Sequence, residues 1–301
     1  NALLKRVCLV TVLTAVAGSS VAQDMNSGYF TQDYIYRHDM NAAFGNDQNY
    51  VAIPVLGSLN MKMQGNFGIG DMLFKNPETG KYDYSFMHPD VSVSDALDGF
   101  NKGKNRISAD LGLTLFSMGF NSFGGYNTVE LRERTSIGMI LPYELFEFAK
   151  NTRNKSYTFD NIGVRATSFA ELALGHSRQI NDDLRVGAKL KVLLGVANAE
   201  LKIDGMKAVM EGDEWMVTTG EAEANVSMKG LEFKYTTDDY KGSRGGSYQH
   251  IDLGETDVDG AGIGGFGMGI DLGAEYQVMD GLKVSAALND LGFIGWSSNN
   301  N

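Results

Sequence analysis

The stretch "AGIGGFGMGIDLGAEYQVMDGLKVSAALNDLGFIGW", residues 261–296, decides the fold class. From Phe266 to Val278 every even position is apolar, whereas the odd positions carry glycine, acidic residues and glutamine. Because side chains of a β-strand alternate between two faces, this period of two predicts a strand with one apolar and one polar face. Asp280-Gly281 is a strong signal for a two-residue hairpin turn, and the alternation resumes after it.

The same alternation recurs along the chain, and two architectures could use it. A soluble sandwich would bury the apolar faces in its core, whereas a membrane barrel would turn them to lipid and its polar faces to the lumen. Several runs alternate for longer than the ~5–6 residues of a typical soluble strand, which favours the barrel. The clear runs lie at 51–63, 107–115, 129–141 and 184–196, with weaker strands expected at 61–74, 213–219, 221–230 and 231–236.

The lengths of the connections point to the same architecture. Tight turns are expected at 181–183 and 280–281, whereas the connections at 75–105, 144–162 and 236–262 are long and polar. Short turns at one end and long loops at the other are typical of outer-membrane barrels. We therefore predict an all-β, antiparallel transmembrane β-barrel of ~12–14 strands when complete.

The N-terminus reads as a secretory signal peptide over residues 1–22. Lys5 and Arg6 precede an apolar run, and Ser20-Val21-Ala22 fits the cleavage rule. The only cysteine, Cys8, lies inside this segment, so disulfide scaffolds and thiolate chemistry are excluded for the mature chain. Residues 23–301 are expected to form one barrel domain. It is expected to be a fragment, incomplete at its C-terminus, because the final residues do not end a strand on an aromatic side chain.

The search for catalytic or metal chemistry gives weak signals. Glu255, Asp257 and Asp259 resemble the first half of a calcium loop but lack the bidentate glutamate at its twelfth position, so a solvated loop is the better interpretation. The four histidines lack metal-ligand spacing. His176 and Ser177 are adjacent, so they point to opposite faces of a strand and do not form an esterase pair. We predict no enzyme, no metal site and no cofactor. The formal charge of −11 argues against nucleic-acid binding.

The start and the hairpins of the mature chain resemble a Bacteroidetes outer-membrane barrel family of unknown function. The stretch beginning "SGYFTQDYIYRHDMNAAF", the hairpin "GHSRQINDDLRVGAKLKVLLGVANAEL" and "AALNDLGFIGW" carry the resemblance. This family is distantly similar to the long-chain fatty-acid transporter and PorV-type barrels. Asn41-Ala42-Ala43-Phe44 resembles the Asn-Pro-Ala-Phe element of that wider group, without its proline. The resemblance implies a barrel and does not identify a cargo.

Charged residues at the polar positions of the strands form the main candidate site. A polar lumen needs its charges paired or hydrated. Two interpretations remain open: a structural lattice of ion pairs that fills the barrel, or a set of charges that selects a passing solute. The expected lumen-facing charges are Glu130, Arg132, Arg134, Glu171, Arg185, Lys189, Lys191, Asp271, Glu275 and Lys283.

Glycines and aromatic residues add two smaller expectations. The lumen-face glycines of the opening stretch would leave room either for a neighbouring strand at a sharp bend or for contents of the barrel. Aromatic residues near the strand ends suit an interfacial girdle or ordinary packing. The glycines are 265, 267, 269 and 273, and the aromatic residues are Tyr143, Phe146, Phe148, Phe293 and Trp296.

The function that follows is a non-catalytic protein of the bacterial outer membrane. Its first expected role is a passive conduit for small or hydrophobic solutes. The alternatives are a non-transporting scaffold or secretion-accessory barrel, and a soluble secreted β-sandwich adhesin. Its expected partners are outer-membrane lipid and a surface or periplasmic protein, with no nucleic acid.

Overall fold

The computed structural model describes most of the chain after the expected signal peptide, which lies outside the described residues. The described residues are 25–31, 33–53, 59–151, 156–211, 214–232, 234–239, 246–251, 257–258 and 262–297. Strands dominate, and every strand pairing among these residues is antiparallel. In the described part of the chain, no helix is both long and apolar enough to cross a bilayer.

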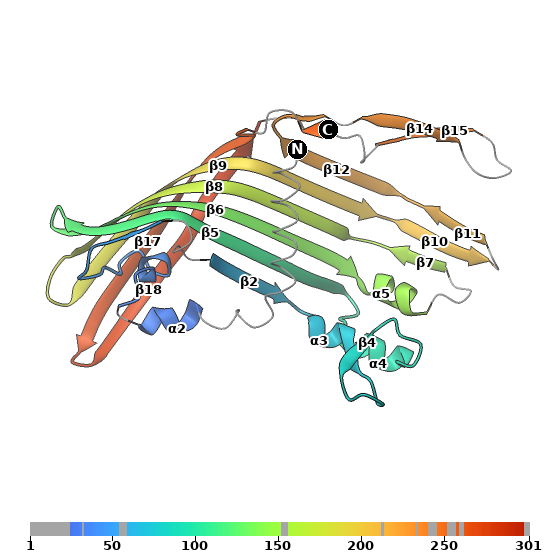
Figure 1. Cartoon of the computed structure of the whole chain (residues 1–301), viewed down its shortest axis with the longest axis horizontal. Coiled ribbons are helices and arrows are strands. Elements are labelled where there is room, and N and C mark those ends of the chain that lie inside the picture. Colours follow the sequence, from blue (N-terminus) through green and yellow to red (C-terminus); the bar gives the residue numbers. More distant parts are fainter. Residues whose placement is uncertain are drawn as a thin grey trace.

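One nine-stranded sheet forms the body of the molecule (Figure 1). Its main path runs β1-β5-β6-β8-β9-β17-β18, while β2 also pairs with β5 and β12 also pairs with β9. These strands are β1 (Tyr50–Ala52), β2 (Leu59–Gly65), β5 (Lys104–Ser122), β6 (Gly125–Pro142), β8 (Ile162–Gln179), β9 (Leu184–Asp204), β12 (Glu221–Met228), β17 (Gly265–Met279) and β18 (Leu282–Trp296).

The sheet does not close on itself within the described residues. No pairing there joins β18, at one end of the path, to β1 or β2 at the other. The predicted antiparallel all-β class is therefore confirmed, whereas the closed barrel is not found.

Three tight turns lie at one end of the large sheet, at the left of Figure 1. Asn181 forms the β8–β9 turn, where its side-chain oxygen accepts from the backbone N–H groups of Asp183 at 3.0 Å and Leu184 at 2.8 Å. The predicted turn at 280–281 joins β17 and β18. The β5–β6 turn was not predicted, and it uses positive φ angles at Phe123 and Gly124.

Short elements gather at the opposite end, where the sequence predicted long polar loops (Figure 1). The strand expected at 61–74 is confirmed only over residues 61–65, because β2 ends at Gly65 and a helical turn follows. The short elements at this end are α3 (Ile69–Met72), β3 (Leu73–Lys75), β4 (Tyr82–Ser85), α4 (Val93–Asp98), α5 (Tyr143–Lys150), β7 (Ser156–Phe159), β10 (Met206–Glu211) and β11 (Glu214–Thr218). The remaining short strands are β13 (Leu231–Glu232), β14 (Tyr235–Asp239), β15 (Ser247–Ile251) and β16 (Asp257–Val258).

Two aromatic clusters pack these loop elements together. One contains Phe67, Phe86, Phe100 and Phe146, and the Phe100 and Phe146 rings stack with centroids 3.9 Å apart. In the second, Phe148 packs against two aromatic residues of β7. Phe146 and Phe148 therefore pack within the loop end and do not form an exposed girdle.

The two faces of the large sheet differ in polarity, and we call them the inner and the outer face. On the inner face Glu130, Glu171 and Lys189 are buried. On the outer face Leu174 is 53 % exposed and Leu190 is 63 % exposed. At these positions the alternation predicted from the sequence is therefore present, with the polar side chains inside and the apolar side chains outside.

β-Bulges change this alternation within the long strands, because an extra residue shifts which side chains share a face. Register shifts occur in β5 between Thr114 and Phe116, in β8–β9 at Ser168/Phe169, and in β17–β18 between Ile270 and Leu272. In β5 the bulge places Ser117, an odd position, on the inner face, where it is buried. The parity predicted for 107–115 therefore does not continue beyond Thr114.

Candidate functional site: a buried ion cluster on the inner face

The N-terminal segment, residues 33–49, lies against the inner face of the large sheet. It contains η1 (Arg37–Asp39) and follows α2 (Met25–Phe30). The Asn41 side-chain amide donates to the carbonyl oxygens of Ala274 at 3.3 Å and Ala286 at 3.1 Å. At the other end of the segment, the Asn121 amide donates to the carbonyl oxygen of Asn46 at 3.2 Å. The segment thus bridges β17–β18 and β5.

Glycines on the inner face allow this close approach. A Cβ atom at Gly187 would overlap the backbone carbonyl of Ala42, and one at Gly273 would overlap the side chain of Asn41. Gly273 therefore leaves room for the N-terminal segment on the inner face of the sheet, which is one of the two uses predicted for these glycines. Gly267 has the other use, because a Cβ atom there would overlap the carbonyl oxygen of Phe293 on the neighbouring strand.

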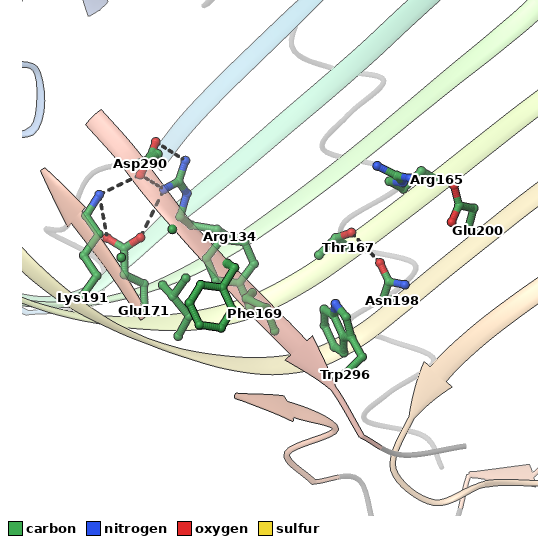
Figure 2. Close-up of a pocket in the computed structure, with 15 residues that line it drawn as sticks. Arg134, Arg165, Thr167, Phe169, Glu171, Lys191, Asn198, Glu200, Asp290 and Trp296 are labelled. Atoms are coloured by element: carbon green, nitrogen blue, oxygen red, sulfur yellow. Dashed lines mark hydrogen bonds and ion pairs between the residues drawn. The ribbon is translucent and has the colours of Figure 1, made fainter. Parts of the chain in front are cut away.

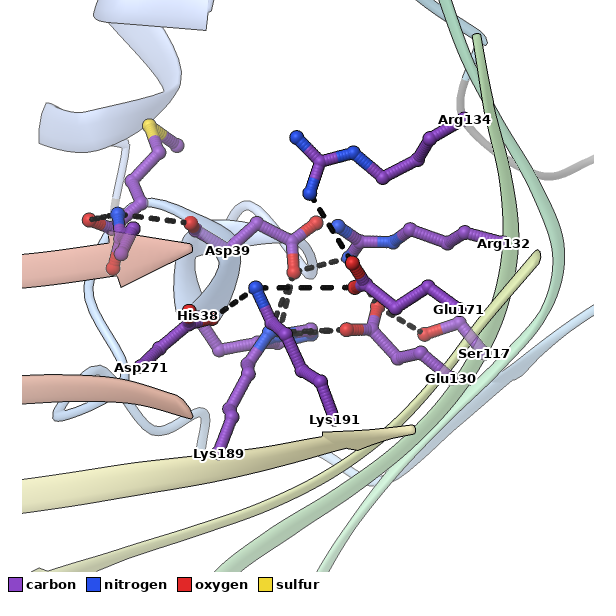
Figure 3. Close-up of polar contacts among 12 residues, drawn as sticks. His38, Asp39, Ser117, Glu130, Arg132, Arg134, Glu171, Lys189, Lys191 and Asp271 are labelled. Carbon is purple, nitrogen blue, oxygen red and sulfur yellow. Dashed lines mark hydrogen bonds and ion pairs between the residues drawn. The ribbon is translucent and has the colours of Figure 1, made fainter. Parts of the chain in front are cut away.

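Lys189 is the centre of the first group of buried charges, which we call the Lys189 group (Figure 3). Its ammonium donates to His38 Nδ1 at 2.8 Å, Asp39 Oδ1 at 2.7 Å and Glu130 Oε2 at 3.0 Å. These three bonds use all three donors of an ammonium group. Arg132 adds an ion pair with Glu130 at 2.7 Å and a second one with Asp39. The N-terminal segment is thus held to β6 and β9 by charge.

A chain of hydrogen bonds leads from His38 back to Glu130. Because Nδ1 of His38 accepts from Lys189, we assign its proton to Nε2, which lies 2.8 Å from the Tyr50 hydroxyl. That hydroxyl lies 2.7 Å from Ser117 Oγ, which donates to Glu130 Oε1 at 3.1 Å. Both oxygens of the Glu130 carboxylate therefore accept hydrogen bonds, as a fully buried carboxylate requires.

The carboxyl group of Asp39 remains ionised in this environment. Burial by itself would raise the pKa of Asp39, but the facing guanidinium of Arg132 and the ammonium of Lys189 outweigh it and hold the pKa well below its usual range. The N-terminal segment therefore contributes a permanent negative charge to the cluster at neutral pH.

Metal binding at the same place would compete with Lys189. Ligand atoms of His38, Asp39 and Glu130 lie within 4.8 Å of one another, a spacing that could hold a cation. The Lys189 ammonium is already hydrogen-bonded to one such atom of each residue. A divalent ion would have to displace this ammonium, so the arrangement fits an internal cation better than a metal centre.

Lys191 is the centre of a second group, which we call the Lys191 group (Figure 3). Its ammonium lies 2.7 Å from both Asp271 Oδ2 and Asp290 Oδ1. Arg134 binds Asp290 with two hydrogen bonds, of 2.7 and 3.1 Å, and donates to Glu171 Oε2 at 3.1 Å. The bonds between Arg134 on β6 and Asp290 on β18 cross the concave side of the sheet, because β8, β9 and β17 lie between these strands.

Seven of the ten predicted charges meet in these two groups. They are Glu130, Arg132 and Lys189 in the Lys189 group, and Arg134, Glu171, Lys191 and Asp271 in the Lys191 group.

The other three predicted charges lie nearer the tight turns. Lys283 pairs loosely with Glu275 at 3.7 Å, and Arg185 donates to Ser177 at 3.2 Å. The acidic loop is not tested, since Glu255 and Asp259 lie outside the described residues and only the backbone of Asp257 is described, in β16.

Sequence reasoning missed His38, Asp39 and Asp290. The two N-terminal residues lie outside any alternating run, so no face could be assigned to them. Asp290 occupies an even position, which local parity places on the apolar face, but Asn289 and Asp290 form a bulge opposite Asp271 that turns Asp290 inward. Its backbone has a φ of 59° and its N–H donates to Asp271 Oδ1 at 2.7 Å. The Asn289-Asp290 pair is a signal for such a bulge, because Asn and Asp tolerate positive φ.

Comparison with known proteins gives one match. The model of a family described as "Family of unknown function (DUF5723)" matches residues 42–301. No curated protein and no solved structure matches the chain.

Proposed function

The chain belongs to this family of unknown function, and we propose that it is a non-catalytic outer-membrane β-barrel protein that acts as a passive conduit for small or hydrophobic solutes. Outer-membrane lipid surrounds the strands in this proposal, and a surface or periplasmic protein is a further expected partner. The tight turns face the periplasm, and the long loop elements face the outside of the cell.

The proposal rests on the polarity of the two sheet faces, which is the reverse of the polarity expected for a water-soluble sheet. Apolar side chains stand exposed along the outer face of neighbouring strands, whereas the opposite face buries ion pairs. A soluble sandwich would cover this apolar face with a second sheet, and the described residues place none over it. The exposed outer-face residues include Ile137, Met139, Leu172, Leu174, Leu190, Val192, Phe266, Met268, Leu272 and Tyr276.

Strand length supports the same environment. The long strands β5, β6, β8, β9, β17 and β18 have 15 to 21 residues. A tilted strand needs about 9–11 residues to cross the apolar core of a bilayer. Each of these strands is therefore long enough to span a membrane and extend beyond it.

The docked N-terminal segment favours one alternative, a non-transporting scaffold. It fills the inner face between β5 and β18 and is held by the Lys189 group. A cavity of about 470 Å³ remains on the inner face beside the Lys191 group. Transport requires that solutes pass this segment or that it moves, whereas a scaffold requires neither.

The test begins with fractionation of the full-length protein in its host and electrophoresis with and without boiling. We expect an outer-membrane protein whose mobility changes on heating, because a closed barrel resists detergent until it is boiled. A soluble protein with no mobility change would contradict the barrel and support the secreted adhesin.

Planar-bilayer recording of the purified protein then separates the two barrel functions. Ion conductance is expected for a conduit. A heat-modifiable barrel without conductance, recovered together with a surface or periplasmic protein, would support the scaffold.

A further inference from the structure

The cavity of about 470 Å³ lies beside the Lys191 group (Figure 2), and its lining contains no residue of the N-terminal segment. Its size falls within the roughly 300–1,000 Å³ of small-molecule sites. Arg134, Glu171, Lys191 and Asp290 form one side of it, and Phe169 and Trp296 line it with apolar surface. The cavity therefore has a charged side and an apolar side, and further polar groups, including Thr167 and Asn198, line a third side.

The charged wall offers no unpaired cation to a ligand. Lys191 is bound by two carboxylates at 2.7 Å, and Arg134 binds Asp290 through two nitrogens. The Lys191 group contains two cations, Arg134 and Lys191, against the three carboxylates of Glu171, Asp271 and Asp290. A carboxylate or phosphate head group entering the cavity would therefore meet a negative balance of charge.

Glu171 offers the opposite kind of site, a buried acceptor without a donor. Glu171 is 1 % exposed, and its Oε1 atom has no hydrogen-bond partner among the described residues. The ammonium of Lys191 is 3.9 Å from this oxygen, too far for a hydrogen bond. Because an unpaired buried acceptor costs free energy, a ligand that donates a hydrogen bond here would be stabilised.

The wall opposite the charges is polar and accessible. Thr167 Oγ1 donates to Asn198 Oδ1 at 2.9 Å, and Arg165 pairs with Glu200 at 2.6 Å near the rim (Figure 2). These side chains could exchange hydrogen bonds with several hydroxyl groups of one ligand.

Trp296 provides a flat apolar surface between the two polar walls. A Cβ atom at Gly195 or Gly265 would lie within 3 Å of its ring, so these glycines seat the indole closely against β9 and β17. Phe169, Leu193 and Ile294 extend the apolar lining. A rigid aromatic face with polar groups on either side suits a ring that has C–H groups on its faces and hydroxyl groups at its edge.

We infer that this cavity binds a neutral, hydroxyl-rich solute of the saccharide class. The inference rests on the proposed conduit and names the class of solute that occupies its inner face. The hydroxyl groups donate to Glu171 Oε1 and bond to the Thr167–Asn198 pair, while one face of the sugar ring packs on Trp296. Because the cations of the Lys191 group are already paired and Glu171 Oε1 lacks a hydrogen-bond donor, a fatty-acid carboxylate is disfavoured at the same place.

Trp296 itself supplies the measurement. The sequence contains two tryptophans, and Trp215 lies in β11, outside the cavity lining. In a Trp215→Phe background the emission therefore reports Trp296 alone. The full chain is purified in lauryldimethylamine oxide, which carries no sugar head group, and titrated with maltose, cellobiose, chitobiose and, separately, sodium laurate. A saturable change of emission is expected with at least one saccharide and not with laurate.

Two variants distinguish specific binding in the cavity from unspecific quenching of the Trp296 emission. Thr167→Val keeps the volume and removes the hydroxyl, so affinity should fall by about threefold to tenfold, the value of one hydrogen bond to a neutral ligand. Leu172→Val, on the outer face of the same strand, should leave affinity unchanged. An equal loss in both variants would contradict the site.

The remaining outcomes separate this inference from the proposed function. Saturable binding of laurate but of no saccharide would overturn the ligand class. Conductance without any effect of saccharide on Trp296 would overturn the inference and leave the conduit intact. A protein without heat-modifiable mobility would overturn the barrel itself, whatever it binds.

Discussion

The inner and outer faces of β8 and β9 are built from alternate residues of the same two strands, yet they have opposite chemistry. On the inner face Glu171 and Lys189 are 1 % and 2 % exposed and lie in ion pairs. One residue along each strand, Leu172 and Leu190 are 39 % and 63 % exposed. In a water-soluble sheet the exposure of these two classes would be exchanged.

This difference indicates what surrounds each face. The charged face is stabilised by partners from elsewhere in the chain, mainly the N-terminal segment and the bulge at Asp290. The apolar face has no partner among the described residues, so its stability depends on the medium outside. The two faces should therefore respond differently to substitution, and the size of each response tests the comparison.

The largest effect is expected for Lys189→Met. Removing the ammonium leaves the buried carboxylates of Asp39 and Glu130 with Arg132 as the remaining shared cation, so one buried negative charge is no longer compensated. This should cost about 3–5 kcal/mol of unfolding free energy. Urea unfolding in detergent or lipid measures it. Lys202→Met is the matched control, since Lys202 lies on the same strand but is exposed. Equal effects of the two variants would show that the Lys189 group is not buried in the folded protein.

A charge introduced on the outer face should cause the next largest loss of unfolding free energy. Leu190→Arg is expected to cost about 2–4 kcal/mol if the outer face contacts lipid near the bilayer midplane. If water contacts this face, the same change should stay within about 0.5 kcal/mol, as for other surface substitutions. The change in unfolding free energy is measured by unfolding in lipid vesicles, and Leu190→Met is the control for the altered shape of the side chain.

A substitution that crowds the docked N-terminal segment should lower the unfolding free energy by a moderate amount. The added Cβ of Gly187→Ala overlaps the Ala42 backbone, and overpacking of this kind typically costs about 1–3 kcal/mol. The segment should then become more accessible to protease. Gly138→Ala is the control, because the nearest atom to its Cβ is 4.0 Å away. If protease cleaves residues 33–49 at the same rate in both variants, the segment does not dock where the structure places it.

Acid should release the segment only under strongly acidic conditions. The folded-state pKa of Asp39 is depressed, so its stabilising effect is complete above the unfolded value of about 3.9 and is lost as pH falls through the lower folded value. The protection of residues 37–49 against hydrogen exchange, relative to the intrinsic exchange rate at each pH, should therefore stay constant from pH 5 to about pH 4 and fall below that. In Asp39→Asn the part of this dependence that comes from the Asp39 carboxyl should be lost, so the fall in protection should be smaller than in the parent protein. Release centred near pH 4 in the parent protein would contradict the buried ion pairs.

The smallest effect is expected at the exposed end of the inner face. Arg165 is 66 % exposed and pairs with Glu200 at 2.6 Å. Exposed ion pairs contribute about 0–1 kcal/mol, so Arg165→Ala should change the unfolding free energy by less than about 1 kcal/mol. A loss comparable to that of Lys189→Met would mean that water does not reach the rim of the cavity.

Local alternation identified much of the fold and part of the site. It identified the long strands, two of the three tight turns and seven of the charges that now meet in the two groups. It failed at Asp290 and beyond Thr114, because one extra residue in a bulge reverses the parity and that depends on the neighbouring strand. The hairpin turn at Phe123-Gly124 was missed because its first residue is not one of the usual turn formers.

Trp296 illustrates the same limit for single residues. Its position near a strand end suggested a membrane girdle, but the shift after Asp271 brings it to the inner face over Gly195. Phe293, three residues earlier, remains 68 % exposed. Two aromatic residues on one strand end thus have different roles that spacing alone did not separate.

The sequence by itself determined which residues share a face, because the period of a strand is a local property of the backbone. It also determined that one face would be apolar and the other charged. Only the tertiary structure decided which charges meet, since Arg134 and Asp290 lie 156 residues apart and approach across the curved sheet. It also brought His38 and Asp39 to Lys189, because docking of a non-periodic segment depends on the shape and charge of the surface that receives it.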